Sequence, residues 1–409
     1  DHHAGASQMH KSGGEWKVQK QRLEWDILKA IQQGAREFGI KPCADFNDGN
    51  NEGSGFFEVN QNNGVRWSTA KAFLRTARKR PNLRVLTHAH SERLLLQGKR
   101  VFGVEFRLKG IRKHAVARRE VILAAGSINS PKLLELSGIG RPDVLSARGV
   151  KILHERPGIG ENLQDHLQIR TVFKVQNADT LNARVNSPLG KAWIALQYAL
   201  NRSGPMSMAP SQFGMFTKSD PSLATADLEY HVQPMSTDKL GDPLHAFPAI
   251  TVSVCNLRPE STGSCHIIMD DSSVQPEIRL NYLSTWKDQQ VALNSVKQAR
   301  KIMTAAALKK YQPEEILPGP AIDKDEALLS SIGDIATTIF HPVGTCKMGN
   351  DAAAVVDDEL RVIGLSGVRV VDASIMPKIT SGNTASPVVM IAEKASDLIQ
   401  KATTRRNTF

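Results

Sequence analysis

The sequence predicts an α/β protein, α+β overall, with two domains. Its 409 residues exceed the length of one small domain. The apolar run VILAAG at residues 121–126 is typical of a strand buried on both faces of an α/β sheet. Between residues 167 and 320, by contrast, apolar and polar residues alternate between polar turns. We therefore expect an α/β body and a second domain with a large antiparallel sheet and flanking helices.

The composition narrows the class of protein. Hydrophobic residues make up 41% and charged residues 23% of the chain, as in ordinary globular proteins with a sizeable core. The net charge of +11 invites a nucleic-acid interpretation, but the basic residues are scattered in short clusters without interleaved aromatics. We predict no nucleic-acid partner. A solvated basic surface is the favoured interpretation, and a loose attraction to an anionic membrane or an acidic partner is the second.

Cysteine usage and hydropathy bear on location. The four cysteines have no CxxC spacing, which fits a reducing compartment and predicts no metal site. No apolar stretch approaches transmembrane length. We therefore expect a cytoplasmic protein, at most peripheral to the inner membrane. Because position 1 is Asp and not Met, we also expect a piece of a longer protein.

Local patterns predict the elements of the first 140 residues. An apolar face from Gln21 onward indicates a helix that ends at Gly39. Ser68 is a candidate N-cap for a second helix over 69–78. Ser130-Pro131 resembles a helix start, with proline at the first helical position and the end at Ser137-Gly138. Short strands are expected at Leu83–Leu86, Arg93–Leu96, Val101–Leu108 and His114–Ala117, with turns at 97–98 and 109–110.

The remaining elements follow from the same rules. Alternation predicts strands at Leu228–Val232, Ala249–Val254 and His266–Met269, and helices are expected over Lys191–Asn201 and Lys287–Leu308. Asp323 and Glu326 form a candidate capping box for a helix toward Thr338. Ser386 and Pro387 are expected to cap and open a final helix, Val388–Ile399.

Three residues near the end of the chain could form a redox-cofactor site. His341 precedes Pro342 and therefore lies on non-helical backbone, although a lone histidine is more often structural than catalytic. Asp372 ends an apolar strand; it could start a solvated turn or lie where open α/β sheets bind nucleotides. Asn383 lies before the final helix, whose free N–H groups favour an anionic group, although a capped helix alone explains the same residues.

Other candidate motifs carry less weight. Residues 157–166, PGIGENLQDH, could cradle a phosphate but match neither the dinucleotide nor the P-loop template. Nothing in the chain matches GxGxxG, and no GxSxG elbow points to an α/β-hydrolase. Cys346 has small apolar neighbours that favour an inert thiol over a nucleophile paired with His341.

Together these stretches resemble the glucose–methanol–choline (GMC) oxidoreductases, the flavoenzyme family that includes choline dehydrogenase. The resemblance covers essentially the whole chain, because the order and spacing of the motifs agree. Within the family, the chain is similar above all to bacterial choline- or alcohol-dehydrogenase-like members. The motifs that carry it are GSINSPKLLELSGIG (126–140), PGIGENLQDH (157–166), HPVGTCKMG (341–349), VVDASIMP (370–377) and SGNTASP (381–387).

The resemblance implies a function and a division of the chain. It implies FAD-dependent oxidation of a primary alcohol, choline-like or other, to the aldehyde, with a quinone or oxygen as electron acceptor. It implies a helical and loop segment at 1–80, part of the FAD-binding domain at 81–166, a substrate-binding domain at 167–335 and a C-terminal FAD-binding segment with the active-site residues at 336–409.

The resemblance also assigns roles to residues. It makes His341 the active-site base and Asn383 its partner on the substrate oxygen. The family's FAD contacts fall on Ser91 beside the adenine, Gly126 in the second motif, Asp372 and Ala373 near the ribityl and pyrophosphate, and Asn383 with Thr384 at the flavin ring.

One part of the family pattern is absent. The N-terminal part with GxGxxG and the GGSS-type signature, which holds the ADP half of FAD, is not in this chain. We therefore expect the chain alone to bind FAD poorly or not at all and to be inactive; a stoichiometric visible flavin band in the purified chain would contradict this. The alternatives are a flavin-dependent lyase of the same fold and a non-catalytic remnant or basic interaction protein.

Overall fold

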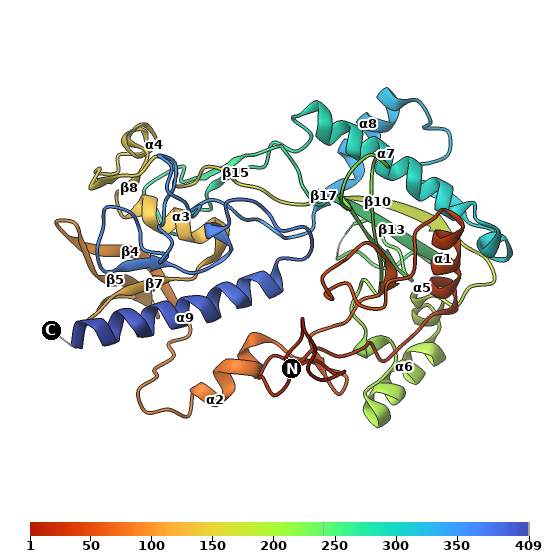
Figure 1. Cartoon of the computed structure of the whole chain (residues 1–409), viewed down its shortest axis with the longest axis horizontal. Helices are drawn as coiled ribbons and strands as arrows, with labels where there is room; N and C mark the ends of the chain where they lie inside the picture. Colours follow the sequence, from red (N-terminus) through yellow and green to blue (C-terminus); the bar gives the residue numbers. More distant parts are fainter. Residues whose placement is uncertain (240, 408–409) are drawn as a thin grey trace. The chain divides into compact units, whose positions relative to one another are not determined.

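The computed structural model describes residues 1–239 and 241–407, and the chain divides into two compact units (Figure 1). Unit 1 comprises Asp1–Val85, Leu167–Asn256 and Gln289–Thr337. Unit 2 comprises Leu86–His166, Leu257–Asp288 and Thr338–Phe409. Each unit is thus assembled from segments that are far apart in the sequence. Residues 257–288, which we expected in the substrate-binding domain, belong to unit 2.

Unit 1 is built on the large antiparallel sheet that the alternation in the middle of the chain predicts. Its strand order is β1-β11-β12-β13-β10-β16, and β17 pairs with β10 as the seventh strand. Neighbours along the first six strands are antiparallel. The strands are β1 (Gly53–Phe56), β10 (Leu167–Lys174), β11 (Phe213–Thr217), β12 (Leu228–Gln233), β13 (Ala249–Asn256), β16 (Glu314–Leu317) and β17 (Ala336–Thr338). The strands predicted from Leu228 and from Ala249 are confirmed.

The side chain of Tyr230 links β12 to a helix that packs on the sheet. Side chains alternate along a strand, so Leu228, Tyr230 and Val232 share one face of the sheet. Tyr230 is fully buried, and its hydroxyl donates to the carbonyl of Ser295 at 2.7 Å. Ser295 lies in α7 (Trp286–Met303), so this bond fixes α7 to that face of the sheet.

The first predicted helix is confirmed, with a later start. α1 spans Asp26–Glu37 and buries Ile27, Leu28, Ile31 and Ala35, the apolar face read from the sequence. It begins at Asp26 because Trp25 is extended, and it ends before Gly39, whose φ of +83° suits glycine. The other helices of unit 1 are a π-helix (Ala70–Leu74) that continues into α2 (Arg75–Ala77), α5 (Leu181–Val185), α6 (Pro188–Asn201), α8 (Asp325–Ile335) and 3-10 helices at Pro205–Ser207 and Ala306–Tyr311. A short hairpin pairs β2 (Gln61–Asn62) with β3 (Val65–Arg66).

Two predicted helices of unit 1 differ from the prediction in their extent. The capping box at Asp323 is wrong, because the N-cap of α8 is Lys324 and it makes no side-chain capping bond. α8 also ends at Ile335, where the chain becomes extended and forms β17. The helix predicted over Lys287–Leu308 is interrupted after Met303 and resumes as a 3-10 helix.

The described part of unit 2 contains four small sheets, of which two correspond to strands expected from the sequence. β4 (Ala89–Gln97), β5 (Arg100–Leu108) and β6 (Ile111–Val116) form an antiparallel meander, with Lys109 and Gly110 in the left-handed region at the second turn. β7 (Val121–Leu123) pairs in parallel with β18 (Val368–Val370). The expectation of a strand buried on both faces is wrong for β7, because it is only three residues long and Ile122 is 38% exposed. The strand expected at Leu83–Leu86 is also wrong: these residues are exposed and pair with no strand in the described part of the chain.

Unit 2 has its own hydrophobic core. It includes Leu123 of β7, Val370 of β18, Leu134, Val343 and Ile391, all buried. The core therefore joins strands, helices and loops from both ends of the chain. The remaining elements are α3 (Gly126–Leu136), α4 (Pro142–Ala147), β8 (Ile139–Gly140) paired with β9 (His154–Glu155), β14 (Ser264–His266) paired with β15 (Glu277–Arg279), a 3-10 helix at Ala373–Ile375 and α9 (Ala385–Asn407).

The start of α3 differs from the prediction for a physical reason. Proline was expected at its first position, but α3 begins at Gly126 and contains Pro131. Pro131 has no N–H to bond the carbonyl of Ser127. That carbonyl instead accepts the hydroxyl of Thr345 at 2.6 Å. A residue more than two hundred positions away thus replaces the missing helical bond.

The final helix also starts earlier than expected. α9 begins at Ala385, and the N–H of Val388 donates to the carbonyl of Thr384 at 3.1 Å. Pro387 is therefore the third helical residue, where no intrahelical donor is needed. The prediction of Ser386 as N-cap is wrong by two residues.

A buried charge network ties α3 to β14 within unit 2. The Nδ1 atom of His266 lies 2.7 Å from Glu135 Oε1, and its Nε2 lies 3.1 Å from Glu161 Oε1. Glu135 is fully buried, and its second oxygen accepts the N–H of Ile267 at 2.8 Å. Burial alone would lower the pKa of His266, but the hydrogen bond and charge of Glu135, and then those of Glu161, raise it overall above its ordinary value of 6.5.

This raised pKa predicts a pH dependence of stability. A group with a raised folded-state pKa stabilises the fold fully below its unfolded pKa, and this contribution is lost as pH rises through the folded pKa. We expect the unfolding free energy to fall as pH rises from about 6.5, and less steeply in Glu135→Gln. Urea unfolding between about pH 6 and pH 9 measures both slopes. Glu105→Gln, which removes the partner of the exposed His114, is the control. Equal slopes in Glu135→Gln and the wild type would contradict the prediction.

Candidate active site

His341 lies in a loop of unit 2 directly after β17. Phe340 before it has a φ of +66°, and His341 itself is half-buried. The main-chain N–H of His341 donates to Asp165 Oδ1 at 2.9 Å. Asp165 Oδ2 accepts two hydroxyls, from Tyr282 and from Thr338, both at 2.5 Å. The buried carboxylate of Asp165 therefore fixes the backbone that carries His341.

A second histidine determines which ring nitrogen of neutral His341 carries the proton. The rings of His166 and His341 meet edge to face, and their Nδ1 atoms are 3.0 Å apart. His166 is fully buried, and its Nε2 lies 3.2 Å from the carbonyl of Leu257. Because a carbonyl only accepts, the proton of neutral His166 is on Nε2 and its Nδ1 is an acceptor. His341 must then donate from Nδ1, which places the lone pair of its neutral ring on Nε2.

This arrangement suits proton abstraction. A neutral imidazole that is held through one nitrogen can accept a proton at the other. Burial, followed by the charge of Asp165 and their hydrogen bond, raises the pKa of Tyr282, so the phenol remains a donor to Asp165. The Tyr282 phenol thus stays protonated and helps to fix the Asp165 carboxylate that holds the His341 backbone.

Asp372 joins β18 to α3. Its Oδ2 accepts the N–H of Gly126 at 2.9 Å and the hydroxyl of Ser130 at 2.6 Å. Its Oδ1 accepts the N–H of Ser374 at 2.9 Å. The carboxylate is buried and bonds three donors, so it connects the carboxyl end of β18 with the first turn of α3.

The adjoining backbone leaves room for a bound group. A Cβ added at Gly126 would meet nothing within 4 Å, and its φ is +81°. Ala124 and Ala125, at the end of β7, are exposed. The parallel strands β7 and β18 both end here, and the carboxyl edge of parallel strands is where open α/β sheets bind nucleotides. Gly126, Asp372 and Ala373 therefore fit one side of a dinucleotide cradle.

The His341 loop is clamped to α3 and to the segment 157–166. Ser127 Oγ donates to the carbonyl of Pro342 at 2.7 Å. Asn162 Nδ2 donates to the carbonyls of Gly344 and Pro377, each at 3.3 Å. A Cβ at Gly344 would lie 2.3 Å from the Asn162 carbonyl, so only glycine allows this approach. Asn162 of the PGIGENLQDH segment thus holds the His341 loop.

The remaining predicted residues are not hydrogen-bonded to this network within the described part of the chain. Asn383 is exposed, and its side chain hydrogen-bonds none of the residues that the structure describes. Thr384 beside it is buried, and its carbonyl caps α9. Ser91 is exposed on β4, next to a bulge in its pairing with β5. Bonds therefore join Gly126 to Asp372, whereas His341 is joined to residues that we did not predict.

Four residues around His341 were missed from the sequence. Asp165, His166, Tyr282 and Thr338 hold or contact it but were not among the predicted site residues. The adjacent Asp165-His166 pair was a usable signal, because an acid and a histidine close the glycine-rich segment. Tyr282 and Thr338 have no local signal, since their role depends on chain packing.

The other reactive groups have different roles. Burial raises the pKa of the Cys346 thiol well above its ordinary value, so Cys346 is a poor nucleophile. Metal-binding side chains gather in unit 1, where His2 and His3 each bond Glu58, at 2.7 and 2.5 Å. These hydrogen bonds account for the cluster without an ion.

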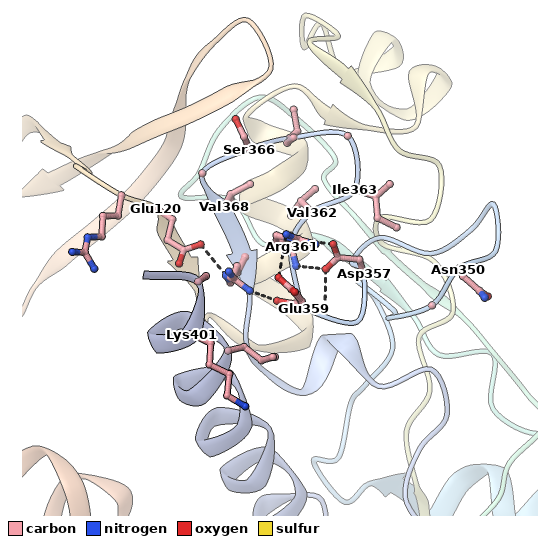
Figure 2. A pocket seen from close by; sticks show the side chains of 18 residues that line it. Glu120, Asn350, Asp357, Glu359, Arg361, Val362, Ile363, Ser366, Val368 and Lys401 are labelled. Carbon is pink, nitrogen blue, oxygen red and sulfur yellow. Dashed lines mark hydrogen bonds and ion pairs between the residues drawn. The ribbon is translucent and has the colours of Figure 1, made fainter. Parts of the chain in front are cut away.

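A surface pocket of about 940 Å³ lies elsewhere in unit 2, beside β18 and α9 (Figure 2). Part of its charged lining is paired internally: Arg369 bonds Glu120 at 2.8 Å, and Arg361 bonds Asp357 at 2.9 Å. Figure 2 labels Arg361 and Asp357 of the second pair. None of the predicted site residues lines it. The pocket is therefore separate from the candidate active site.

The chain resembles known proteins over most of its length. Models described as GMC oxidoreductase match residues 4–168 and 259–392. An alcohol dehydrogenase [acceptor] from Pseudomonas putida is 36% identical over 396 residues, covering 96% of this chain and 72% of that protein. Mitochondrial choline dehydrogenase from Mus musculus is 36% identical over 401 residues, covering 98% of this chain and 67% of that protein.

Solved structures agree on the fold. Pyridoxine 4-oxidase from Mesorbium loti superposes with a TM-score of 0.86 at 27% identity, covering 97% of this chain and 74% of that chain. A formate oxidase from Aspergillus oryzae RIB40 has a TM-score of 0.89 at 23% identity, with the same coverage, and this likeness concerns the fold alone. The two-domain fold expected from the sequence is confirmed, and the chain belongs to the GMC oxidoreductase family.

Proposed function

We propose that this protein takes part in the FAD-dependent oxidation of a primary alcohol, choline-like or another, to the aldehyde. Membership of the GMC oxidoreductases and the relatedness to alcohol and choline dehydrogenases support an oxidoreductase acting on CH–OH groups. The single observation that carries the mechanism is the bond between the Nδ1 atoms of His341 and His166, because it leaves the lone pair of His341 on Nε2.

FAD fits the residues that the chain offers. The open backbone at Gly126 and the carboxyl ends of β7 and β18 support one side of its site. Gly126, Asp372 and Ala373 would hold the ribityl and pyrophosphate region, Asn383 and Thr384 would face the ring, and Ser91 would lie beside the adenine. When bound, FAD supplies the acceptor for the hydride that leaves the alcohol carbon.

The residues of the chain supply the proton chemistry. His341 Nε2 takes the proton of the substrate hydroxyl, and the O–H electron pair becomes the second bond of the carbonyl as hydride leaves the carbon. Asn383 donates to the developing alkoxide without titrating. Asp165 and His166 hold the His341 loop and ring in the orientation required for this step.

The partners follow from the reaction. It takes a small-molecule alcohol and requires an electron acceptor, for which we propose a quinone or oxygen. In the described part of the chain, no helix combines the length and apolar character needed to cross a bilayer. We propose peripheral membrane association, supported by the net charge of +11, because basic surfaces are attracted to anionic lipids.

Anaerobic reduction tests the proposal. The protein, carrying the family's N-terminal nucleotide-binding segment ahead of Asp1, is loaded with FAD and mixed with a panel of primary alcohols without oxygen. We expect the visible flavin band to bleach with at least one alcohol. A loaded protein that releases aldehyde from a hydroxynitrile without bleaching would favour the lyase alternative. No turnover with either substrate class would favour a non-catalytic protein.

A further inference from the structure

The helix α6 of unit 1 carries a stripe of exposed apolar residues. Leu189, Trp193, Leu196 and Leu200 are 83%, 62%, 48% and 71% exposed, respectively. Their spacings of four, three and four residues place them on one face of the helix. We call these four residues the α6 stripe. Burying such side chains is ordinarily favourable, so a continuous exposed row of them indicates a surface that meets another apolar phase.

The opposite face shows that α6 is well formed. Ile194 is buried, and the Tyr198 hydroxyl donates to the carbonyl of Gly64 at 3.2 Å. Ser187 caps the N-terminus by accepting the N–H of Gly190 at 3.3 Å, and Pro188 opens the helix. The stripe is therefore presented on a fixed helix, and Figure 1 shows α6 at the outer edge of its unit.

Charge around the stripe selects the partner. Residues 180–219 contain four basic residues and no aspartate or glutamate; Arg184 pairs with Asp179 and Lys218 with Glu52, which leaves Lys191 and Arg202 as the cations of the helix itself. Lys191 is exposed within the helix, and Arg202 is exposed at its end. Exposed Arg22 donates to the carbonyls of Asn201 and Arg202, at 3.0 and 3.1 Å, which adds a third cation there. An apolar face of leucine and tryptophan beside exposed basic side chains is typical of helices that lie on anionic membranes.

The length of α6 fixes how it would lie. Its 14 residues extend about 21 Å, which is less than the roughly 30 Å hydrocarbon core of a bilayer. It therefore cannot span the membrane but can lie flat at the headgroup level, where tryptophan is favoured.

We propose that the α6 stripe docks this protein on an anionic lipid surface. The inference rests on the peripheral membrane association proposed above and names the surface responsible. The lysine and arginines contact lipid phosphates, while the stripe enters the boundary between headgroups and acyl chains. Such docking would hold the protein beside apolar alcohols and membrane quinones, which partition into the same layer.

Vesicle co-sedimentation of the 409-residue chain tests the proposal. The probes are vesicles of phosphatidylglycerol mixed with phosphatidylcholine, and vesicles of phosphatidylcholine alone. We expect binding to the anionic vesicles that salt weakens. Trp193→Ser and Leu200→Ser should each weaken partitioning about tenfold, because each removes one side chain from the apolar layer. Lys191→Gln should weaken it about fivefold on the anionic vesicles only.

A matched control separates the stripe from general hydrophobicity. Trp286 is 74% exposed but lies at the start of α7 and outside the α6 stripe, so Trp286→Ser should bind like the wild type. Trp193→Phe should keep binding but lose the lipid-induced blue shift of tryptophan emission. Because these side chains are exposed, the unfolding midpoints of the variants should match the wild type.

The outcomes distinguish the two proposals. If the wild type binds and the stripe variants bind equally well, membrane association stands and the assignment to α6 fails. If the wild type binds neither vesicle, both fail. If Leu200→Ser instead converts a wild-type dimer into monomers and lipid binding is absent, the stripe is an interface between copies of this chain and the proposal is overturned.

Discussion

Replacing His341 by alanine is expected to lower kcat/KM for the alcohol by about 10²–10⁴-fold, the usual contribution of a positioned general base. The expected loss follows from the lone pair on His341 Nε2, which the contact of its Nδ1 with His166 defines. The measurement is the reduction of a quinone-analogue dye by the FAD-loaded protein that carries the family's N-terminal segment. Flavin content, read from its absorbance, should remain unchanged.

A second histidine of unit 2 provides the control. His114 is exposed and pairs with Glu105 at 2.9 Å, away from the His341 loop. His114→Ala should turn over at the wild-type rate, which excludes a general effect of losing an imidazole. If His341→Ala also retained wild-type turnover with full flavin content, the base assignment would fail.

The antiparallel sheet of unit 1 was predictable because its signal is local. The strand from Leu228 alternates apolar and polar residues, and β12 appears there with Tyr230 inside. The grouping of segments was not predictable in the same way. Residues 257–288 have the same pattern of apolar stretches between polar turns as the middle of the chain. They nevertheless belong to unit 2, through contacts such as that of His266 with Glu135. Periodicity defines a strand but does not identify its partner.

The predicted helix starts were wrong where bonds from distant residues replaced local capping. Ser130-Pro131 is a sound local signal for a helix start. α3 nevertheless begins five residues before Pro131, because Thr345 bonds the Ser127 carbonyl and Asp372 bonds the Gly126 N–H. Such bonds join positions more than two hundred residues apart, so no window along the sequence contains them.

The candidate site was predictable in its motifs but not in its connections. His341 and Asp372 stood out because each follows a clear change of backbone pattern. His166 did not, because its segment was interpreted as a glycine-rich loop. Its role appears only where the chain brings its ring against His341, 175 positions away. The roles of Asn383 and Ser91 depend on a bound flavin, so they remain predictions.

Of the substitutions proposed for this protein, replacement of Asp372 is expected to lower the free energy of unfolding most. Asp372→Ala leaves the N–H groups of Gly126 and Ser374 and the hydroxyl of Ser130 without their buried acceptor. Bonds to a charged acceptor stabilise more than neutral ones, and unsatisfied buried donors add a penalty. We expect the unfolding free energy to fall by about 4 kcal/mol in Asp372→Ala. Asp372→Asn should lose less, because its amide keeps one acceptor oxygen. Urea unfolding followed by circular dichroism measures both.

Asp271 provides a matched control for this prediction. Its Oδ1 accepts an N–H and a hydroxyl from Ser273, at 2.8 and 2.7 Å, but in an exposed turn. Water can replace these bonds, so Asp271→Asn should unfold close to the wild type. If the Asp372 variants were as stable as Asp271→Asn, the carboxylate would not be what holds β18 to α3. The Gly126 backbone, on which the proposed FAD site depends, would then require another support.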